Sequence, residues 1–189
     1  RTPIEARDLA FLAAKHAYLN GAIDVHILWS DDDLTLLLYT HAPEEVLNNV
    51  PEFQKEMYRY YLNQGAGFLS FTGSDPDLLK TIDPKVLQGA MMNRSKALEF
   101  YSEAMMIDKN PWTGAGVATK AWAKKIYPEL DEDEALETLW DAIFDMSRVT
   151  DDAVKTWEDH MNRINALAKK MTDYKFKSLH YQNSLGTDL

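Results

Sequence analysis

The stretch that decides the fold class is Gly65-Ala66-Gly67-Phe68-Leu69-Ser70-Phe71, followed at once by Gly73-Ser74-Asp75-Pro76. The first three residues end a tyrosine-rich helical segment, residues 52–63. The short apolar run 68–71 between turn residues predicts a β-strand. The second motif is typical of a turn that leads into a new helix cap. A strand placed between two helices is the repeating element of α/β proteins.

Similar strands are predicted on both sides of this stretch. Residues 25–29 form a short apolar run, residues 110–118 predict a third strand, and Lys177 to Tyr181 reads as a fourth. Helices alternate with these strands, which implies right-handed βαβ units. The sequence therefore predicts a helix-rich, Rossmann-like α/β fold with a mainly parallel sheet of three to five short strands flanked by helices.

The predicted helices have recognisable starts and stops. Segment 4–20 ends at Asn20-Gly21, and a helix capped near Asp31 runs to about Leu47 with a break at Ala42-Pro43. A further helix starts at Asp83-Pro84 and is expected to reach Ile107. Two short helices flank Tyr127-Pro128, and Asp131 caps the second of them. The last helix carries an apolar stripe at spacings of three and four, made of Val154, Trp157, Met161, Ile164, Ala168 and Met171.

Both ends of the chain suggest a piece of a longer protein. Arg1-Thr2-Pro3 leads directly into a helix pattern without an initiator methionine, and one sheet strand is expected upstream of it. Ser184-Leu185-Gly186-Thr187-Asp188-Leu189 ends on an apolar residue and looks like the opening of a new element. We expect residues 1–176 to be one α/β domain and residues 177–189 to be a strand and linker into a further domain.

Composition narrows the class of protein. The net charge of −10 disfavours binding to nucleic acid, which needs clustered Lys and Arg. The chain has no cysteine, which rules out disulfides and thiolate chemistry within it. It also contains no apolar run of the about 18 residues needed to cross a membrane. A globular α/β protein with an acidic surface fits these numbers.

No histidine lies at metal-ligand spacing from another. The five histidines are His16, His26, His41, His160 and His180. The nearest thing to a metal cluster is Glu158-Asp159-His160, but consecutive residues of a helix point in different directions. We therefore interpret this cluster as a solvated helix face, and we assign no catalytic, metal-binding or cofactor-binding residue.

Two other motifs have a structural and a functional interpretation. Asp31-Asp32-Asp33 could bind Ca²⁺ or Mg²⁺, yet a helix pattern follows at once, which favours helix capping. The run from Gly114 to Thr119 reads G-x-G-x-x-T and suggests a phosphate-binding loop, but it lacks the third glycine. Glycines such as Gly114 and Gly116 also serve close backbone packing, and we favour that interpretation.

Six stretches, in this order and spacing, resemble one family. They are residues 26–35 (HILWSDDDLT), 42–47 (APEEVL), 75–80 (DPDLLK), 119–123 (TKAWA), 137–144 (ETLWDAIF) and 185–189 (LGTDL). Together they resemble the N-terminal domain of the thermophilic-type metallo-aminopeptidases, the aminopeptidase S/T family.

The resemblance implies a two-domain, cytoplasmic exopeptidase that removes N-terminal residues from peptides and forms a homodimer. It implies two divalent metals, zinc or cobalt, held in the C-terminal domain beyond Leu189, so none is expected in this chain. The role implied for this chain is non-catalytic: it shapes the substrate cavity and access to it, beside its own C-terminal domain.

One departure and two alternatives accompany this hypothesis. Family members carry branched residues and a proline around 114–118, so Gly114 and Gly116 predict a weaker strand or one approached closely by another backbone. The alternatives are a stand-alone α/β module that binds a nucleotide or sugar phosphate, and a dimerisation module without a ligand.

Overall fold

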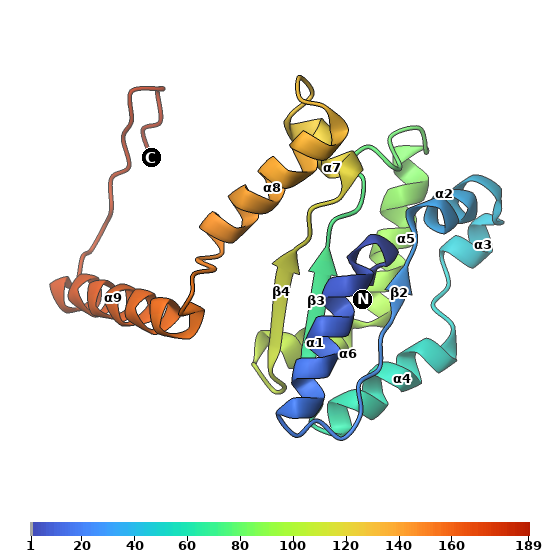
Figure 1. Cartoon of the computed structure of the whole chain (residues 1–189), viewed down its shortest axis with the longest axis horizontal. Coiled ribbons are helices and arrows are strands. Elements are labelled where there is room, and N and C mark those ends of the chain that lie inside the picture. Colours follow the sequence, from blue (N-terminus) through green and yellow to red (C-terminus); the bar gives the residue numbers. More distant parts are fainter. Residues whose placement is uncertain (1) are drawn as a thin grey trace. The chain divides into compact units, whose positions relative to one another are not determined.

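The computed structural model describes residues 2–189, and it divides into two compact units, Arg1–Ile143 and Phe144–Leu189. The first unit contains all four strands and most of the helices (Figure 1). The second contains the end of one helix, one long helix and a C-terminal segment. The two units are described separately below.

The strands of the first unit form two parallel pairs. Strand β1 (Thr2–Pro3) pairs with β2 (Trp29–Ser30), and β3 (Phe68–Thr72) pairs with β4 (Trp112–Gly116). Strand β1 also contacts β3, so the two pairs lie next to each other (Figure 1). The prediction of short parallel strands in a helix-rich α/β fold is therefore confirmed, although the strands form two small sheets and not one.

The first helices follow their sequence signals closely. A 3-10 turn η1 (Ile4–Ala6) leads into α1 (Arg7–Leu19), and Gly21 follows it with a positive φ of 92°. Helix α2 (Asp32–His41) is separated from α3 (Glu44–Leu47) at Ala42 and Pro43. Helix α4 (Glu52–Asn63) occupies the predicted tyrosine-rich segment. Local capping and breaking residues thus set these boundaries.

The later helices contain one break that the sequence pattern did not predict. The helix expected from Pro84 to Ile107 is interrupted at Leu98 into α5 (Pro84–Ala97) and α6 (Glu99–Met106). Leu98 is buried, so packing of its side chain accompanies the break. Helices α7 (Lys120–Ile126) and α8 (Glu132–Met146) flank Tyr127-Pro128 as predicted.

Two strand predictions are wrong in their extent. Of the segment 25–29 only Trp29 belongs to a strand, although Leu28 accepts a backbone hydrogen bond from Thr2 at 2.8 Å. No strand forms over 177–181, and the C-terminal segment instead has an isolated antiparallel bridge between Gln182 and Asp188. A strand needs a paired neighbour along its length, which neither segment has among the described residues.

The core of the first unit consists of two clusters of small and branched side chains. One joins α1 to the strands through Ala6, Ala10, Phe71 and Val117. The other joins α7 to α8 through Ala118, Ala123, Ala135, Leu139 and Ile143. Because alanine has a small side chain, these helices pack close to their neighbours, and burial of the larger side chains supplies the main stabilising term.

The second unit is dominated by α9 (Ala153–Tyr174). Asp152 caps this helix, since its Oδ1 accepts a hydrogen bond from the Lys155 amide at 3.1 Å, and Lys175 ends it with a positive φ of 50°. The predicted amphipathic stripe is present, but its large side chains are exposed: Val154, Trp157, Met161, Ile164 and Met171. Among the residues that the structure describes, no helix is long and apolar enough to cross a membrane.

Candidate functional site

The loops that follow β2, β3 and β4 leave the carboxyl ends of parallel strands, where α/β proteins commonly bind ligands. Asp31 and Asp32 follow β2, the turn Gly73–Asp77 follows β3, and Thr119 precedes α7. These are also the polar residues that the sequence singles out in this part of the chain. The question is whether their polar groups are free to bind a ligand.

Hydrogen bonds between these loops occupy most of their polar groups. The Asp31 Oδ1 accepts from the Leu34 amide at 3.0 Å, which confirms its predicted capping role. The Asp32 Oδ2 accepts from the Asp75 amide at 2.8 Å and so ties the β3 turn to the start of α2. The buried Thr119 hydroxyl donates to the Gly73 carbonyl oxygen at 2.5 Å. Side chains of these loops thus hold the loops together at the carboxyl ends of the strands.

Close backbone packing occurs at Gly73 and not at the predicted glycines. A Cβ atom on Gly73 would lie 2.3 Å from the Val117 carbonyl oxygen, which real Cβ atoms do not allow. At Gly114 a Cβ would be 3.7 Å from the Ser70 carbonyl oxygen, an ordinary contact. At Gly116 it would meet the Trp122 ring at 3.4 Å, so a side chain and not a backbone lies closest there.

Both glycines of the suggested phosphate loop belong to a strand, and only Val117, Ala118 and Thr119 lie between this strand and α7. Gly114 and Gly116 lie inside β4, with their ladder partners Ser70 and Thr72 on β3. A phosphate-binding glycine loop instead sits between a strand and a helix, where its amides point at the ligand. The nucleotide-binding alternative therefore loses the motif on which it rested.

An ion pair on the surface of this edge joins Asp77 to α7. The Lys125 Nζ lies 2.6 Å from the Asp77 Oδ2, and the Lys80 Nζ lies 3.7 Å from the same oxygen. The hydrogen bond from Lys125 is the main reason why the pKa of Asp77 lies below its ordinary value, and the attraction of Lys80 adds to it.

Replacing Lys125 with glutamine is expected to raise the pKa of Asp77 toward its ordinary value, because the largest lowering influence is lost. A lowered pKa stabilises the folded state above the pKa of the unfolded chain, and this stabilisation is lost as the pH falls through the folded-state pKa. Carboxyl carbon NMR across an acid titration measures the shift. Lys80→Gln is the control and should produce a smaller shift; equal shifts in both variants would contradict the assignment.

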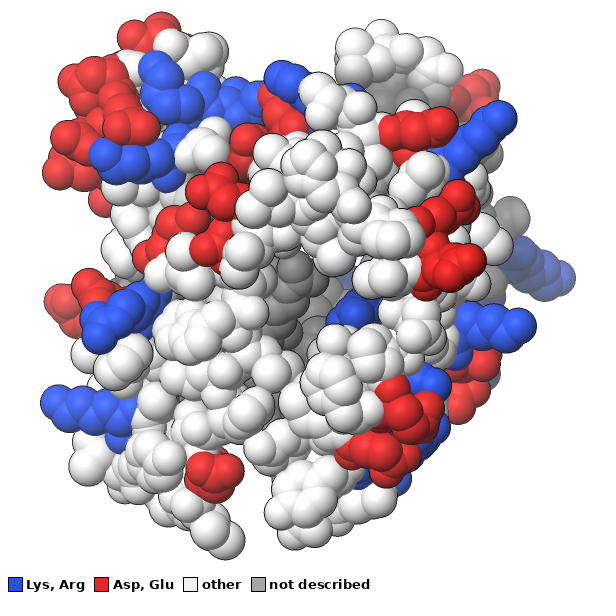
Figure 2. All heavy atoms as spheres, turned by 90° about the vertical axis from the view of Figure 1, so that its right-hand side faces the viewer, with Lys and Arg blue, Asp and Glu red and all other residues white. Residues whose placement is uncertain are grey.

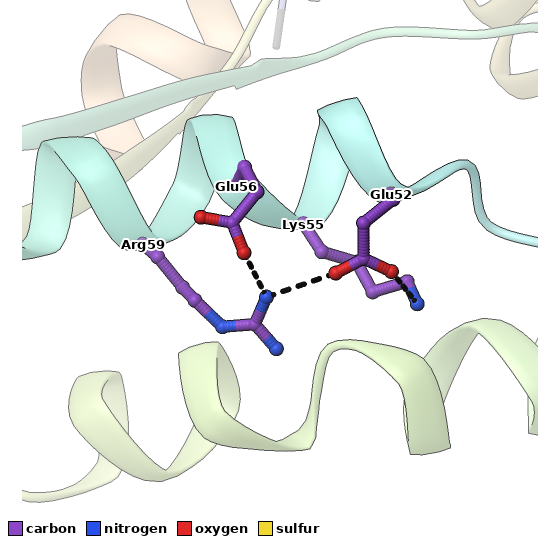
Figure 3. Close-up of polar contacts among 4 residues, drawn as sticks. All are labelled: Glu52, Lys55, Glu56 and Arg59. Atoms are coloured by element: carbon purple, nitrogen blue, oxygen red, sulfur yellow. Dashed lines mark hydrogen bonds and ion pairs between the residues drawn. The ribbon is translucent and has the colours of Figure 1, made fainter.

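Helix α4 carries the most connected set of charges among the described residues (Figure 3). Glu52 contacts Lys55 at 2.5 Å and Arg59 at 3.2 Å, and Arg59 reaches Glu56 at 2.5 Å. Hydrogen bonds from Lys55 and then Arg59 place the pKa of Glu52 below its ordinary value. The Arg59 guanidinium also stacks over the Phe100 ring at 4.6 Å. These ion pairs lie on the surface of α4, where Lys55 and Arg59 are already engaged by Glu52 and Glu56. They therefore stabilise α4 modestly and do not form a binding site.

Acidic and basic side chains are interspersed over the face of the first unit that Figure 2 shows. Its middle is hollowed and mainly uncharged, and the charges gather toward the periphery (Figure 2). A phosphate-backbone partner requires a continuous basic surface. The face shown has no such continuous basic surface.

The histidines do not assemble into a metal site. Within residues 2–189 no group of three or more His, Cys, Asp or Glu side chains could hold a metal ion. His160 contacts the Trp157 ring edge-on at 5.5 Å, and its pKa is lowered by burial and by Arg148 and Arg163. His26 stacks on Tyr61 at 5.6 Å. Glu158 and Asp159 are exposed on α9, and His160 is partly exposed.

One pair that sequence reasoning missed lies in the C-terminal segment. The His180 Nε2 contacts the Asp188 Oδ1, and the Gln182 side chain donates to the other Asp188 oxygen at 3.4 Å. Backbone hydrogen bonds between Tyr181 and Leu189 bring the two side chains together. The sequence feature that could have revealed this pair is the turn at Asn183–Gly186, which folds the chain back on itself. Two exposed groups are too few to hold a metal ion.

Comparison with known proteins decides the family. The family model described as thermophilic metalloprotease (M29) matches residues 1–189. The chain belongs to this family. This M29 chain is 37% identical over 181 residues to Aminopeptidase 2 of Geobacillus stearothermophilus, with 95% of the chain and 44% of that relative covered. It is 34% identical over 188 residues to Aminopeptidase T of Thermus aquaticus, covering 99% of the chain and 46% of the relative.

A solved structure agrees with the sequence relatives. Wild-type AmpT from Thermus thermophilus superposes on the M29 chain with a TM-score of 0.88 at 31% identity, covering 99% of this chain and 46% of AmpT. The resemblance to the aminopeptidase S/T family is therefore confirmed. The M29 chain corresponds to the N-terminal portion of these relatives and spans about half of their length (44% to 46%).

The metals of a metalloprotease do not fit the residues described here. A catalytic zinc site uses at least three protein ligands that converge on one point. Several carboxylates of this M29 chain form helix caps, loop ties or surface ion pairs, and no three-ligand group exists among residues 2–189. We therefore derive no catalytic step within this chain.

Proposed function

We propose that this chain is a non-catalytic part of a metal-dependent aminopeptidase that removes N-terminal residues from peptides. The observation that carries the proposal is the match of the family model to residues 1–189, in a chain whose described residues contain no metal-binding group. The two divalent metals, zinc or cobalt, are then held by residues outside this chain. Relatives named aminopeptidases support the peptide substrate.

The role proposed for the chain itself is to shape the substrate cavity and to limit access to short peptides. Metal ions with their neighbouring carboxylates carry out water attack on a peptide bond. A domain without metal ligands instead forms walls of the substrate cavity and excludes substrates that are too large to enter it. The interlocked loops at the carboxyl edge of the strands, tied by Asp32 and Thr119, support this role because they make a rigid surface.

Deleting residues 1–176 from the full-length enzyme is expected to reduce its discrimination between short and long peptides. The measurement is kcat/KM for a series of peptides of increasing length, for the enzyme with and without the deletion. Unchanged length selectivity in an active, folded deletion variant would contradict the proposal.

The chain by itself provides a second test that does not require the deletion variant to fold. Residues 1–189, purified and dialysed against zinc or cobalt, are expected to retain far less than one metal ion per chain and to release no N-terminal residue from peptides. Elemental analysis by mass spectrometry measures the metal. Stoichiometric binding, or peptide cleavage in proportion to the chain concentration, would overturn the proposal.

The proposal includes a domain arrangement that the family resemblance implies. Residues 1–176 form the N-terminal domain and residues 177–189 lead into a C-terminal catalytic domain, in a cytoplasmic homodimer.

The dimerisation alternative has one supporting observation, the exposed apolar stripe of α9. Sedimentation of the chain across a wide concentration range tests it. A monomer at every concentration would argue against a dimerisation module.

A further inference from the structure

Asn20-Gly21, at the end of α1, is the only place in the sequence where an asparagine precedes a glycine. Both residues are exposed. The side-chain amide of an asparagine can react with the main-chain nitrogen of the next residue, and a glycine at that position has no side chain to hinder the approach. Neither residue has a part in the proposed function, but together they carry the groups for a covalent change of the main chain.

The reaction is deamidation. The Gly21 nitrogen gives its proton to solvent and attacks the Asn20 Cγ, so that a new N–Cγ bond closes a five-membered succinimide ring. The Cγ–Nδ2 bond breaks, and the leaving group takes a proton from solvent and departs as ammonia. Water then opens the ring at either carbonyl carbon. One opening gives aspartate, and the other gives isoaspartate, in which the main chain runs through Cβ and Cγ.

The folded end of α1 holds the reacting atoms apart. The Asn20 Nδ2 donates to the His16 carbonyl oxygen at 2.8 Å, which directs the side chain back along the helix. The Gly21 amide donates to the Tyr18 carbonyl oxygen at 3.1 Å, so its proton is engaged. The ψ angle of Asn20 is 16°, which places the Gly21 nitrogen beside the Asn20 nitrogen and away from Cβ. Ring closure requires the opposite placement, with the Gly21 nitrogen beside Cβ.

A third hydrogen bond completes this helix end. The Ala22 amide donates to the Ala17 carbonyl oxygen at 3.0 Å, and Gly21 between them has a positive φ of 92°. This is the Schellman arrangement, in which a left-handed glycine closes the last turn of a helix. All of these atoms belong to residues 16–22, so the arrangement is a local property of the helix end. Helix ends open more readily than the elements of a core, so the last turn opens without unfolding of the whole unit.

We propose that Asn20 is a site of spontaneous deamidation and that opening of the last turn of α1 controls its rate. The reaction proceeds only in molecules in which this turn is open. Its rate in the folded protein is then the rate in the unfolded chain multiplied by the fraction of molecules with an open turn. Because the hydrogen bonds of Asn20 Nδ2 and the Gly21 amide must both break, the folded protein is expected to react at least about tenfold more slowly than the unfolded chain.

The products cannot restore the original helix end. A carboxylate at position 20 has no hydrogen to donate to the His16 carbonyl oxygen, and its negative charge is unfavourable at the C-terminus of a helix. Isoaspartate also lengthens the main chain between α1 and β2, in the segment that leads to the hydrogen bond from the Thr2 amide to the Leu28 carbonyl oxygen. Deamidated molecules therefore keep a weakened end of α1, and they accumulate with the age of the protein.

The test is the rate of deamidation at Asn20 in the full-length protein, incubated in mildly alkaline buffer with and without enough urea to unfold it. Digestion and mass spectrometry measure the conversion of the side-chain amide to a carboxyl group, and chromatography separates the aspartate and isoaspartate products. We expect both products in both conditions, and slower conversion in the folded protein. Aspartate alone would exclude attack by the Gly21 nitrogen. None of these measurements involves peptide hydrolysis, so the result is independent of the proposed function.

A pair of neighbouring variants tests the control by the last turn. Ala22→Pro removes the amide that donates to Ala17 and leaves both reacting residues in place. The ratio of the folded rate to the unfolded rate is expected to rise about fivefold, the effect of one hydrogen bond of ordinary strength. Ile23→Ala is the control, because the Ile23 side chain is fully exposed, and its ratio should not change. Each variant is compared with its own unfolded chain, so any direct effect of the substitution on the chemistry cancels.

Hydrogen exchange gives the open fraction without any substitution. The protection of the Gly21 and Ala22 amides measures how often the last turn opens, and this fraction should agree with the ratio of the two deamidation rates. Three further results would overturn the inference. The first is an equal rate in the folded and unfolded protein. The second is a folded rate that matches the frequency of global unfolding. The third is a folded Ala22→Pro variant that reacts no faster, relative to its unfolded chain, than the Ile23→Ala variant.

Discussion

Replacing Gly73 with alanine is expected to lower the free energy of unfolding by about 3 kcal/mol, at the upper end of the usual cost of overpacking. The new Cβ would lie 2.3 Å from the Val117 carbonyl oxygen and 3.1 Å from the Thr119 Cγ2. The nearest obstacle is backbone that follows β4, so the β3 turn and the start of α7 must move apart. Urea denaturation followed by circular dichroism measures the loss.

Gly67→Ala is the matched control, because it changes a glycine just before β3 in the same way. Its Cβ would lie 3.7 Å from the Pro111 carbonyl oxygen, an ordinary contact. The substitution should be close to neutral, or stabilising by up to about 1 kcal/mol through a less flexible unfolded chain. If both variants lost the same stability, the close approach at Gly73 would not be the cause.

The Gly73 substitution should also affect the loops at the carboxyl ends of β2, β3 and β4. The Gly73 carbonyl oxygen accepts the Thr119 hydroxyl at 2.5 Å, and Asp75 two residues later is held by Asp32. A shift of this turn therefore loosens both ties. Under the proposed function, this variant of the full-length protein is expected to discriminate less by peptide length, measured as kcat/KM over a peptide series at a temperature where it remains folded.

Replacing Asn110 with aspartate is expected to destabilise the protein by about 4 kcal/mol at neutral pH, the cost of an unpaired buried charge. Asn110 is only 1% exposed, and its Nδ2 donates to the Ala66 carbonyl oxygen at 3.0 Å and to the Leu62 carbonyl oxygen at 3.3 Å. A carboxylate has no hydrogen to donate and would face two carbonyl oxygens. Thermal or urea unfolding measures the loss.

Asn110→Ala separates the charge from the lost hydrogen bonds. The Asn110 Oδ1 is buried without a hydrogen-bond partner, so alanine removes an unsatisfied atom together with the useful donor. Leu62 keeps a backbone bond from Gly65 at 3.2 Å, and mainly the Ala66 carbonyl oxygen loses its partner. The expected cost is about 2 kcal/mol, clearly less than for aspartate. An alanine variant as unstable as the aspartate variant would refute the role of charge.

Acidification gives an independent check of the aspartate variant. A carboxyl group placed among carbonyl oxygens has its folded-state pKa raised, because burial and the facing oxygens disfavour the charged form. Its stability relative to the unmodified protein is then greatest below the unfolded-state pKa and falls as the pH rises. The difference in free energy of unfolding between the Asn110→Asp variant and the unmodified protein should therefore become smaller in acid.

Local signals predicted most of the helices. Residues 52–63 were predicted as a helix and form α4, and Asp31, Asp83 and Asp152 accept hydrogen bonds from amides of the first helical turn as capping residues do. These caps depend on residues two or three apart, so the chain near each cap is sufficient to specify them. The break at Leu98 was missed, because it coincides with burial of a side chain in the tertiary structure.

Strands were predicted less well than helices, for a physical reason. Residues 68–71 and 110–118 contain the paired strands β3 and β4, but 25–29 and 177–181, which were also predicted as strands, form little or no strand. A strand is completed by hydrogen bonds to a neighbour that is distant in sequence. The sequence of the strand itself does not show whether that neighbour is present.

The sequence alone determined the α/β class, most helix boundaries and the lack of a metal-ligand motif, because each depends on residue types at short spacing. It also carried the resemblance to the aminopeptidase S/T family, through six short stretches in order. Only the tertiary structure showed that Gly73, and not Gly114 or Gly116, is the point of close backbone approach. Only the structure showed that Asn110 joins the end of α4 to the start of β4. Those features arise from residues more than 40 positions apart (|i−j| of 43 to 48 in the ties of Asp32, Thr119 and Asn110), whose meeting is decided by packing of the whole unit.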